Sequence, residues 1–218
     1  MILYDTDAPG PNPVTVRLFV LERGGLDFDV AIVSLAALEN RGEAYRAQVN
    51  SRGEVPALRL DDGRVLTEIT AICEYLDEIA SGGTSLIGAT PEERAITRMW
   101  TRRADFEIAQ PLVAWWRGSS DAQAFYQGHR VLGPDAQGYH QRLTEAGLAR
   151  FEAELADKPF LCGDRLSLAD ILLYAFYATM GATAPWAAAE NRPNFLAWLA
   201  RMAARPAAAA MFEPLPGR

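Results

Sequence analysis

The sequence predicts an α/β domain over residues 1–80, a linker over residues 81–90 and an all-helical domain over residues 91–218. In the first domain, strand-like and helix-like runs alternate in the order βαβ and then ββα. The linker holds three glycines among small polar residues. Beyond it, only the helical spacing of apolar residues recurs. The predicted fold class is therefore α/β followed by all-α.

The first strand and the first helix are separated by a turn rich in glycine and proline. Residues 2–4 are typical of a strand. Asn12 is a favourable N-cap, and Pro13 suits the first helical position. The residues that follow are apolar nearly all round as far as Leu21, so we expect a buried helix. The glycine pair at 24–25 ends it.

The sequence of the rest of the first domain predicts a strand, a short helix, a hairpin and a longer helix. Residues 29–33 read as the strand, and residues 39–47 as a polar, weakly specified helix. Asp61-Asp62-Gly63 predicts a tight turn between two antiparallel strands over residues 57–66. Apolar residues at helical spacing over residues 69–79 then predict the last helix of this domain.

The sequence of the second domain predicts helices throughout. A long helical segment extends over residues 91–116, where we expect Pro111 to introduce a kink. Helical spacing resumes over residues 139–155. Ser167-Leu168-Ala169-Asp170 has the spacing of a capping box ahead of an apolar run. The final helix is expected over residues 194–204.

Composition and charge exclude several classes of protein. Acidic residues outnumber basic ones by 28 to 21, so we expect no nucleic-acid partner. The long uncharged stretch at 171–189 is interrupted by Gly181 and Pro185, so we expect no membrane span. The N-terminus lacks the pattern of a secretory signal, which favours a cytoplasmic protein. Both cysteines are then expected to be reduced, with Cys73 buried and Cys162 structural.

Several segments carry a more specific signal than the order of the elements. Residues 52–58 read Arg-Gly-Glu-Val-Pro-Ala-Leu, and residues 66–72 read Leu-Thr-Glu-Ile-Thr-Ala-Ile. Together they resemble the glutathione-site segment of the cytosolic glutathione transferases. Residues 160–170 resemble the helical-domain folding motif of that superfamily, and residues 192–195 with Trp198 resemble its last-helix motif. The resemblance implies a thioredoxin-like first domain, glutathione as cosubstrate, no metal and a homodimer.

The resemblance also implies a glutathione site. The Val55–Pro56 bond would be cis, and the backbone of Val55 would pair with the cysteinyl residue of glutathione. The helix that follows Glu68 would bind the γ-glutamyl carboxylate through its first N–H groups, and Glu68 would accept the ammonium. Ile69 keeps this N–H where the family commonly has serine. Arg41 matches a position facing the glycyl carboxylate, although a solvated arginine is an equal alternative.

The group that would activate the glutathione thiol differs from the usual ones in the family. Gly10 stands where serine or cysteine catalysts occur, and Thr6 stands near the tyrosine position of other classes. Asn12 matches the asparagine of bacterial glutathione transferases with a Thr-Pro-Asn segment. Its side-chain carbonyl would cap the first helix while its NH₂ donates to the sulfur. A helix cap without a catalytic role is the alternative.

The second domain offers candidates for substrate binding. Trp115 and Trp116 match the region where the family places the side chains of an apolar electrophile pocket, and core packing is the alternative interpretation. His129 and His140 do not have the spacing of metal ligands, so we expect no metal site.

Three functions remain open at this stage. The first is an enzyme that adds the glutathione thiolate to a small apolar electrophile. The second is glutathione-dependent exchange on a small disulfide at the same site. The third is a binding or assembly module without catalysis, which the glycine at position 10 favours.

Overall fold

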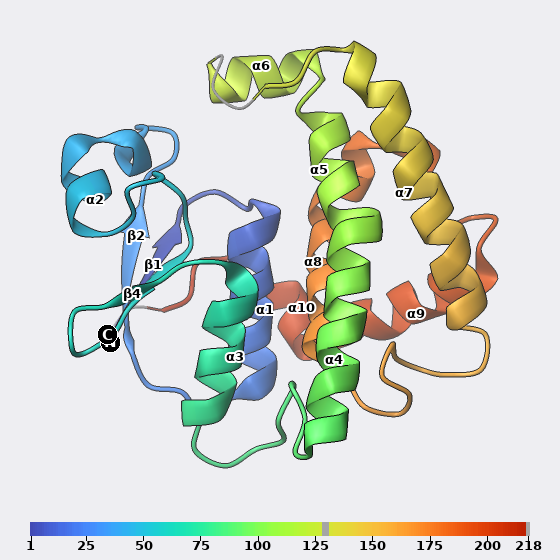
Figure 1. Ribbon diagram of the computed structural model, residues 1–218, viewed down its shortest axis with the longest axis horizontal. Helices are drawn as coiled ribbons and strands as arrows, with labels where there is room; N and C mark the ends of the chain where they lie inside the picture. Colours follow the sequence, from blue (N-terminus) through green and yellow to red (C-terminus); the bar gives the residue numbers. More distant parts are fainter. Residues whose placement is uncertain (128–130, 217–218) are drawn as a thin grey trace. The chain divides into compact units, whose positions relative to one another are not determined.

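The computed structural model describes residues 1–127 and 131–216 (Figure 1). The chain divides into two compact units. The first comprises residues 1–89 together with the C-terminal segment from Arg205, and the second comprises residues 90–204. The expected helical domain ran to the end of the chain, whereas the C-terminal segment clusters with the first unit. The reason is a set of buried contacts with the first helix, described below.

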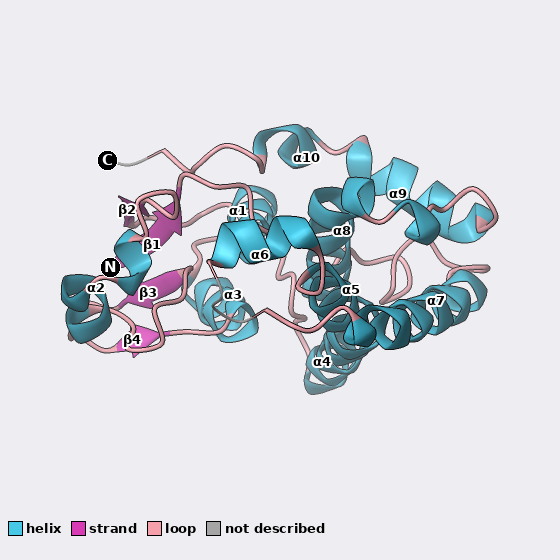
Figure 2. Cartoon of the chain, turned by 90° about the horizontal axis from the view of Figure 1, so that it is seen from above, coloured by secondary structure: helices cyan, strands magenta, loops and turns pink. Residues whose placement is uncertain are grey.

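The first unit is built on a four-stranded sheet with the order β2-β1-β3-β4. β1 (Ile2–Thr6) is parallel to β2 (Asp29–Val33) and antiparallel to β3 (Ala57–Arg59), which is antiparallel to β4 (Val65–Leu66). The expected order βαβ and then ββα is therefore confirmed. Figure 2 shows helices α1 and α3 on one side of the sheet and α2 on the other.

Among the helices of the first unit, α1 and α3 bury an apolar layer against the sheet. The bounds of the helices in this unit are α1 Pro11–Arg23, η1 Glu39–Arg41, α2 Glu43–Gln48, α3 Ile69–Ile79 and α10 Pro206–Ala210. The side chains of this core are fully buried and come from β1, α1, β3 and α3; they include Leu3, Leu18, Phe19, Leu58, Ile72 and Leu76. At about 25 cal/mol per Å² of apolar surface, such burial is the main term that stabilises the unit.

The start of α1 differs from the sequence prediction. The helix begins at Pro11 with Gly10 as its N-cap, so Asn12 occupies the second helical position and caps nothing. Pro11 and Pro13 both fit the first turn, because the N–H groups there have no intrahelical acceptor. With two prolines available, the chain starts the helix at the earlier one, and the Val14 N–H donates to the Gly10 carbonyl at 3.1 Å. The predicted end at Gly24 is confirmed.

In the described residues of the second unit, the named elements are all helices. They are α4 Pro91–Ala104, η2 Asp105–Ala109, α5 Gln110–Trp116, α6 Ser120–Tyr126, α7 Asp135–Glu154, α8 Leu168–Met180, η3 Gly181–Thr183, η4 Pro185–Ala187 and α9 Pro193–Ala203. Two isolated β-bridges, Phe160–Gly163 and Cys162–Arg165, lie in the loop before α8. Within the described ranges, none of these helices combines the length and apolar character needed to cross a lipid bilayer.

The long segment 91–116 is interrupted where the sequence places Pro111. The turn η2 is a π-helix, and Pro111 lies at the start of α5. Since proline has no N–H, the carbonyl of Glu107 loses its ordinary helical donor. Gly147 of α7 packs against that carbonyl so closely that a Cβ atom would lie 2.3 Å from the oxygen. A glycine is therefore required on α7 at this crossing.

The capping box at the start of α8 is present as predicted. Asp170 is fully buried and accepts hydrogen bonds from the N–H groups of Leu161 at 2.9 Å and Ser167 at 3.1 Å. It also accepts from the Ser167 hydroxyl at 2.9 Å and from the Trp198 indole N–H at 3.0 Å. Burial raises the pKa of Asp170. One carboxylate thus joins α8, α9 and the loop before α8.

Candidate active site

The sheet register brings the predicted site segments to one end of the first unit. The antiparallel β1–β3 pair ends at Tyr4 and Ala57, so the C-terminal end of β1 and the Val55–Pro56 segment that precedes β3 lie at the same end of the sheet. Leu58 pairs with Leu66 across β3 and β4, so the chain that leaves β4 towards α3 also starts from this end of the sheet. The loop before α1, the Val55–Pro56 segment and the start of α3 therefore meet at this end.

The Val55–Pro56 segment offers an unpaired backbone edge. Its peptide bond is cis, as the resemblance implies. Val55 is half-buried, and its N–H and C=O form no hydrogen bond with another residue in the described part of the chain. Gly53, two residues earlier, has φ +65°, and a Cβ atom there would lie 2.8 Å from the Asn40 carbonyl oxygen. The loop is thus closely packed next to an edge that remains available to a ligand.

Tyr45 and two asparagines hold this loop. The Tyr45 hydroxyl donates to the Glu54 carbonyl at 2.8 Å, and the Asn50 side chain donates to the same carbonyl at 3.0 Å. Asn40 donates to the Gly53 carbonyl at 2.7 Å. Burial raises the pKa of Tyr45, so its hydroxyl stays protonated and can donate.

Sequence reasoning missed Tyr45 because it treated residues 39–47 as a polar, weakly specified helix. Tyr45 is buried in α2, and its ring lies edge-on to Tyr4 of β1 with a centroid distance of 6.0 Å. One large aromatic residue in an otherwise polar segment was the available signal. Arg41, at the end of η1, is half-buried, and its assignment to a glycyl carboxylate stays a prediction.

Glu68 has an unusual backbone at the start of α3. Its φ of 70° and ψ of 119° lie outside the regions favoured by L-residues. Such an outlier points to a functional constraint. The Glu68 carbonyl accepts from the Ile72 N–H at 3.0 Å, while the N–H groups of residues 69–71 lie in the first turn, where the helix offers no acceptor. The side chains of Glu68 and Arg52 are 69% and 70% exposed, and their nearest charged atoms are 3.9 Å apart.

The two candidate thiol donors are in different environments. Asn12 is half-buried in the first turn of α1, and its side chain makes no hydrogen bond with any other described residue. Thr6 is fully buried, and its hydroxyl donates to Asp7 and accepts from the Ala8 N–H, both at 3.3 Å. The Ser34 hydroxyl donates to the Asp7 carboxylate at 2.8 Å and lowers the pKa of Asp7. Asn12 therefore keeps a free donor, and Thr6 does not.

A buried ion pair supports this end of the sheet. Arg17 of α1 and Asp5 of β1 are 2.8 Å apart, and each side chain is 1% exposed. The Arg17 guanidinium also donates to the carbonyl of Thr6 and, at 3.0 Å, to that of Phe212. The Leu215 N–H donates to Asp5 at 3.4 Å. The pair thus joins the end of β1, α1 and the C-terminal segment.

The two adjacent tryptophans of α5 face different neighbours in the second unit. Trp115 lies edge-on to Trp186, with ring centroids 5.1 Å apart. Trp116 contacts Phe125 at 5.9 Å and Tyr126 at 5.7 Å. Both tryptophans are half-buried, so each exposes part of its side chain. Their assignment to an electrophile pocket stays a prediction.

The two thiols and His140, all within the described residues, do not form a catalytic cluster. Cys73 is fully buried and Cys162 is half-buried, and burial raises the pKa of both thiols. His140 is half-buried in α7, while His129 lies outside the described residues. The residues that the structure describes contain no group of three or more His, Cys, Asp or Glu side chains suited to holding a metal ion.

Comparison with known proteins identifies the family. The sequence-family model of the glutathione S-transferase N-terminal domain matches residues 11–79 of this chain. The family model of the glutathione S-transferase C-terminal domain matches residues 134–206. Glutathione S-transferase 2 of Saccharomyces cerevisiae is 32% identical over 225 aligned residues, which cover 98% of this chain and 90% of the relative. The chain belongs to the cytosolic glutathione S-transferase superfamily.

Two further comparisons extend this result. A glutathione S-transferase domain-containing protein of Marinobacter aquaeolei has a crystal structure that matches with a TM-score of 0.86 and 33% identity, covering 95% of this chain and 100% of that one. The tetrachloro-p-hydroquinone reductive dehalogenase of Sphingobium chlorophenolicum is 28% identical, covering 85% of each chain. The relatives of this chain therefore support a glutathione-using transferase or reductase function.

Proposed function

We propose that this protein binds glutathione at the end of the sheet described above and activates its thiolate for attack on a small apolar electrophile. The observation that carries the proposal is the meeting of three features at one end of the sheet. These are the unpaired backbone of Val55, the free N–H groups after Glu68 and the free amide of Asn12. Each offers a contact to a different part of the tripeptide.

The tripeptide would be held through its backbone and both ends. Val55 pairs with the cysteinyl N–H and C=O as an added strand segment. The first N–H groups of α3, including that of Ile69, bind the γ-glutamyl carboxylate, because a helix N-terminus carries partial positive charge. The Glu68 carboxylate accepts from the ammonium. Arg41 then binds the glycyl carboxylate at the opposite end.

Asn12 would act as the donor to the sulfur. A free cysteine thiol has a pKa of about 8.5, so it is mostly protonated at neutral pH. Lowering that value by one unit requires roughly 1.4 kcal/mol of preferential stabilisation of the thiolate. The Asn12 NH₂ and the positive end of α1 can supply this stabilisation of the thiolate, since both favour an anion. The buried and occupied hydroxyl of Thr6 supports Asn12 as the donor.

The test compares the Asn12→Ala and Thr6→Val variants in the conjugation of glutathione with an aryl halide. Asn12→Ala is expected to lower kcat/KM about tenfold near pH 6.5, and by less near pH 9, because the free thiol is ionised there without help. Thr6→Val should change this profile little, because its hydroxyl serves the local turn. Equal profiles for the Asn12→Ala variant and the unmodified protein would remove Asn12 from the mechanism.

A reductase activity is the second candidate, and one relative favours it by its name, a reductive dehalogenase. In disulfide exchange the bound thiolate attacks a small disulfide, and a second glutathione releases the mixed product. Turnover of a small disulfide without conjugation of aryl halides would favour this activity. Retention on immobilised glutathione without turnover of either substrate would instead indicate a binding module.

We also propose that the protein forms a homodimer. Three large apolar side chains, Ile96, Met99 and Phe106, lie along one face of α4 and η2 and are 44%, 48% and 64% exposed. A stripe of this kind is typical of a surface that a partner covers. Light scattering of the Phe106→Glu variant should then give the mass of a monomer, with Phe125→Glu as the control. A dimer in both variants would exclude this face.

A further inference from the structure

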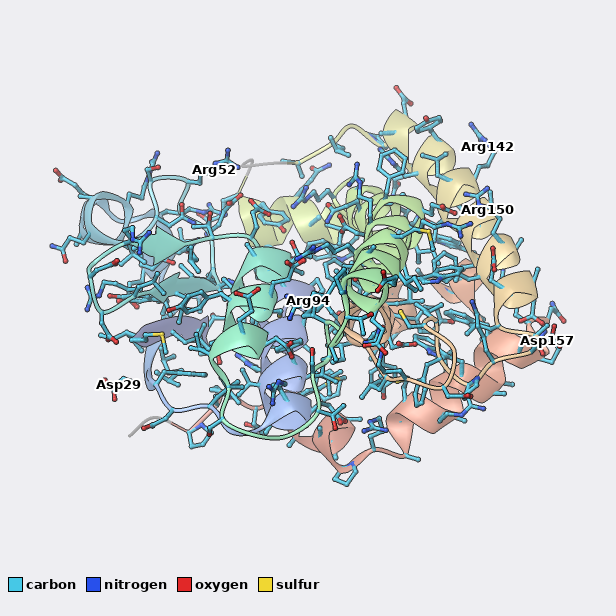
Figure 3. The ribbon with its side chains drawn as sticks, turned by 60° about the horizontal axis from the view of Figure 1, so that its bottom comes forward. Asp29, Arg52, Arg94, Arg142, Arg150 and Asp157 are labelled. Carbon is cyan, nitrogen blue, oxygen red and sulfur yellow. The ribbon has the colours of Figure 1, made fainter. Side chains whose placement is uncertain are left out.

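We propose that Arg52 binds the α-carboxylate of the γ-glutamyl residue, so that Arg52 and Glu68 together recognise the zwitterionic end of glutathione. This inference rests on the proposed function and assigns a role to a residue that the proposed function leaves without one. Arg52 is labelled in Figure 3, where its side chain lies at the surface of the molecule.

The geometry of the pair leaves both side chains able to bind a ligand. Arg52 Nη1 and Glu68 Oε1 are 3.9 Å apart, which is within ion-pair range but too far for a hydrogen bond. Both side chains are about two-thirds exposed, at 70% and 69%. Neither forms a side-chain hydrogen bond with another residue in the described ranges. Opposite charges therefore lie next to each other while their donors and acceptors stay unused.

The backbone beneath each side chain is fixed. The Arg52 N–H donates to the Asn50 side-chain oxygen at 3.0 Å, and the Gly53 N–H donates to the Asn50 carbonyl at 2.8 Å. Asn50 is itself buried. Glu68 has the unusual backbone conformation that directs the chain into α3. The two side chains therefore project from anchored positions, and their charged ends lie next to each other near the start of α3.

The chemistry of the ligand matches this arrangement. The ammonium and the α-carboxylate of a γ-glutamyl residue are attached to the same carbon, so they present opposite charges side by side. Glu68 can accept from the ammonium, and the planar fork of Arg52 can donate two parallel bonds to the carboxylate. Ile69 contributes only its N–H to that carboxylate, since it has no hydroxyl. Arg52 thus supplies a charged donor where the isoleucine side chain provides none.

The test uses titration calorimetry with two tripeptides, glutathione and 4-aminobutyryl-cysteinyl-glycine, which lacks only the α-carboxylate. Arg52→Gln is expected to weaken binding of glutathione roughly tenfold, the effect of losing one charge-assisted contact. It should weaken binding of the decarboxylated peptide less than about twofold, because the contact is already absent. Arg52→Lys should restore part of the affinity, since it keeps the charge and loses the fork.

Arg64→Gln is the matched control. Arg64 is an exposed arginine of the same unit that pairs with Asp62 in the hairpin turn, at 2.6 Å. Its loss should leave both affinities unchanged. If Arg52→Gln weakens both peptides equally, or neither, the inference is overturned while glutathione binding stands. If the unmodified protein binds neither peptide, the proposed function itself fails.

Discussion

Replacing Arg17 with methionine should destabilise the first unit strongly, because it leaves a charge buried without its partner. Asp5 would keep only the N–H donors of Thr6, at 2.8 Å, and Leu215, at 3.4 Å. It would lose the three guanidinium contacts between 2.8 and 3.1 Å. The carbonyls of Thr6 and Phe212 would also lose a donor.

The expected loss in the free energy of unfolding follows from these lost contacts. Removing one partner of a buried pair costs about 3–5 kcal/mol, mostly because the remaining charge is desolvated. Adding Asp5→Asn to Arg17→Met removes that charge, while the asparagine oxygen can still accept from the Thr6 N–H. We therefore expect the double variant to be more stable than Arg17→Met alone, by roughly 2 kcal/mol.

The assay must report on the first unit. All five tryptophans of the chain lie in the second unit, so tryptophan fluorescence does not report on the first unit directly; they are Trp100, Trp115, Trp116, Trp186 and Trp198. Urea unfolding is therefore followed by far-UV circular dichroism. Hydrogen exchange of peptides from residues 1–80 then measures the loss of stability within the first unit. Fluorescence of the same samples serves as the internal comparison.

Two results would refute the reasoning. One is a loss below about 1 kcal/mol for Arg17→Met, the size found for solvent-exposed pairs. The other is a double variant whose loss equals the sum of the two single losses, since coupled charges cannot act independently.

Three further predictions concern stability. Gly147→Ala should cost about 1–3 kcal/mol in fluorescence-detected unfolding, because its Cβ would collide with the Glu107 carbonyl, whereas Gly138→Ala, whose Cβ would have 3.6 Å of clearance, should not destabilise. Asp170→Ala should cost at least about 3 kcal/mol in the same assay, because four donors lose their acceptor, and a loss below 1 kcal/mol would contradict this. Tyr45 has a pKa raised above its unfolded value of about 10, so its contribution is complete below pH 10 and is lost as the pH rises further. The urea midpoint should therefore fall more steeply above pH 10 in the unmodified protein than in Tyr45→Phe, and parallel curves would disprove this.

Local patterns were enough for the fold class and for the site segments that depend on spacing. The Asp61-Asp62-Gly63 turn, the capping box at Ser167–Asp170 and the apolar period over residues 69–79 each act within a few residues. The same holds for the Val55–Pro56 segment, which directly precedes β3, and for Glu68, which directly precedes α3. Such features can be read from the sequence because neighbouring residues determine them.

The start of α1 shows where local rules become ambiguous. Gly10-Pro11-Asn12-Pro13 offers two acceptable helix starts, and the choice changes Asn12 from a cap into a side chain with a free amide. The role of Tyr45 was equally hidden, because its partners Tyr4 and Glu54 belong to other segments of the chain.

The sequence by itself determined the order of elements and the class of fold, since periodicity, turns and caps operate over short distances. Only the tertiary structure decided which polar groups are buried and with whom they pair. Arg17 looks like one residue of an apolar helix, yet it meets the carbonyl of Phe212, 195 positions away. A buried charge requires a partner wherever the chain can bring one, and that partner is selected by packing rather than by proximity in sequence.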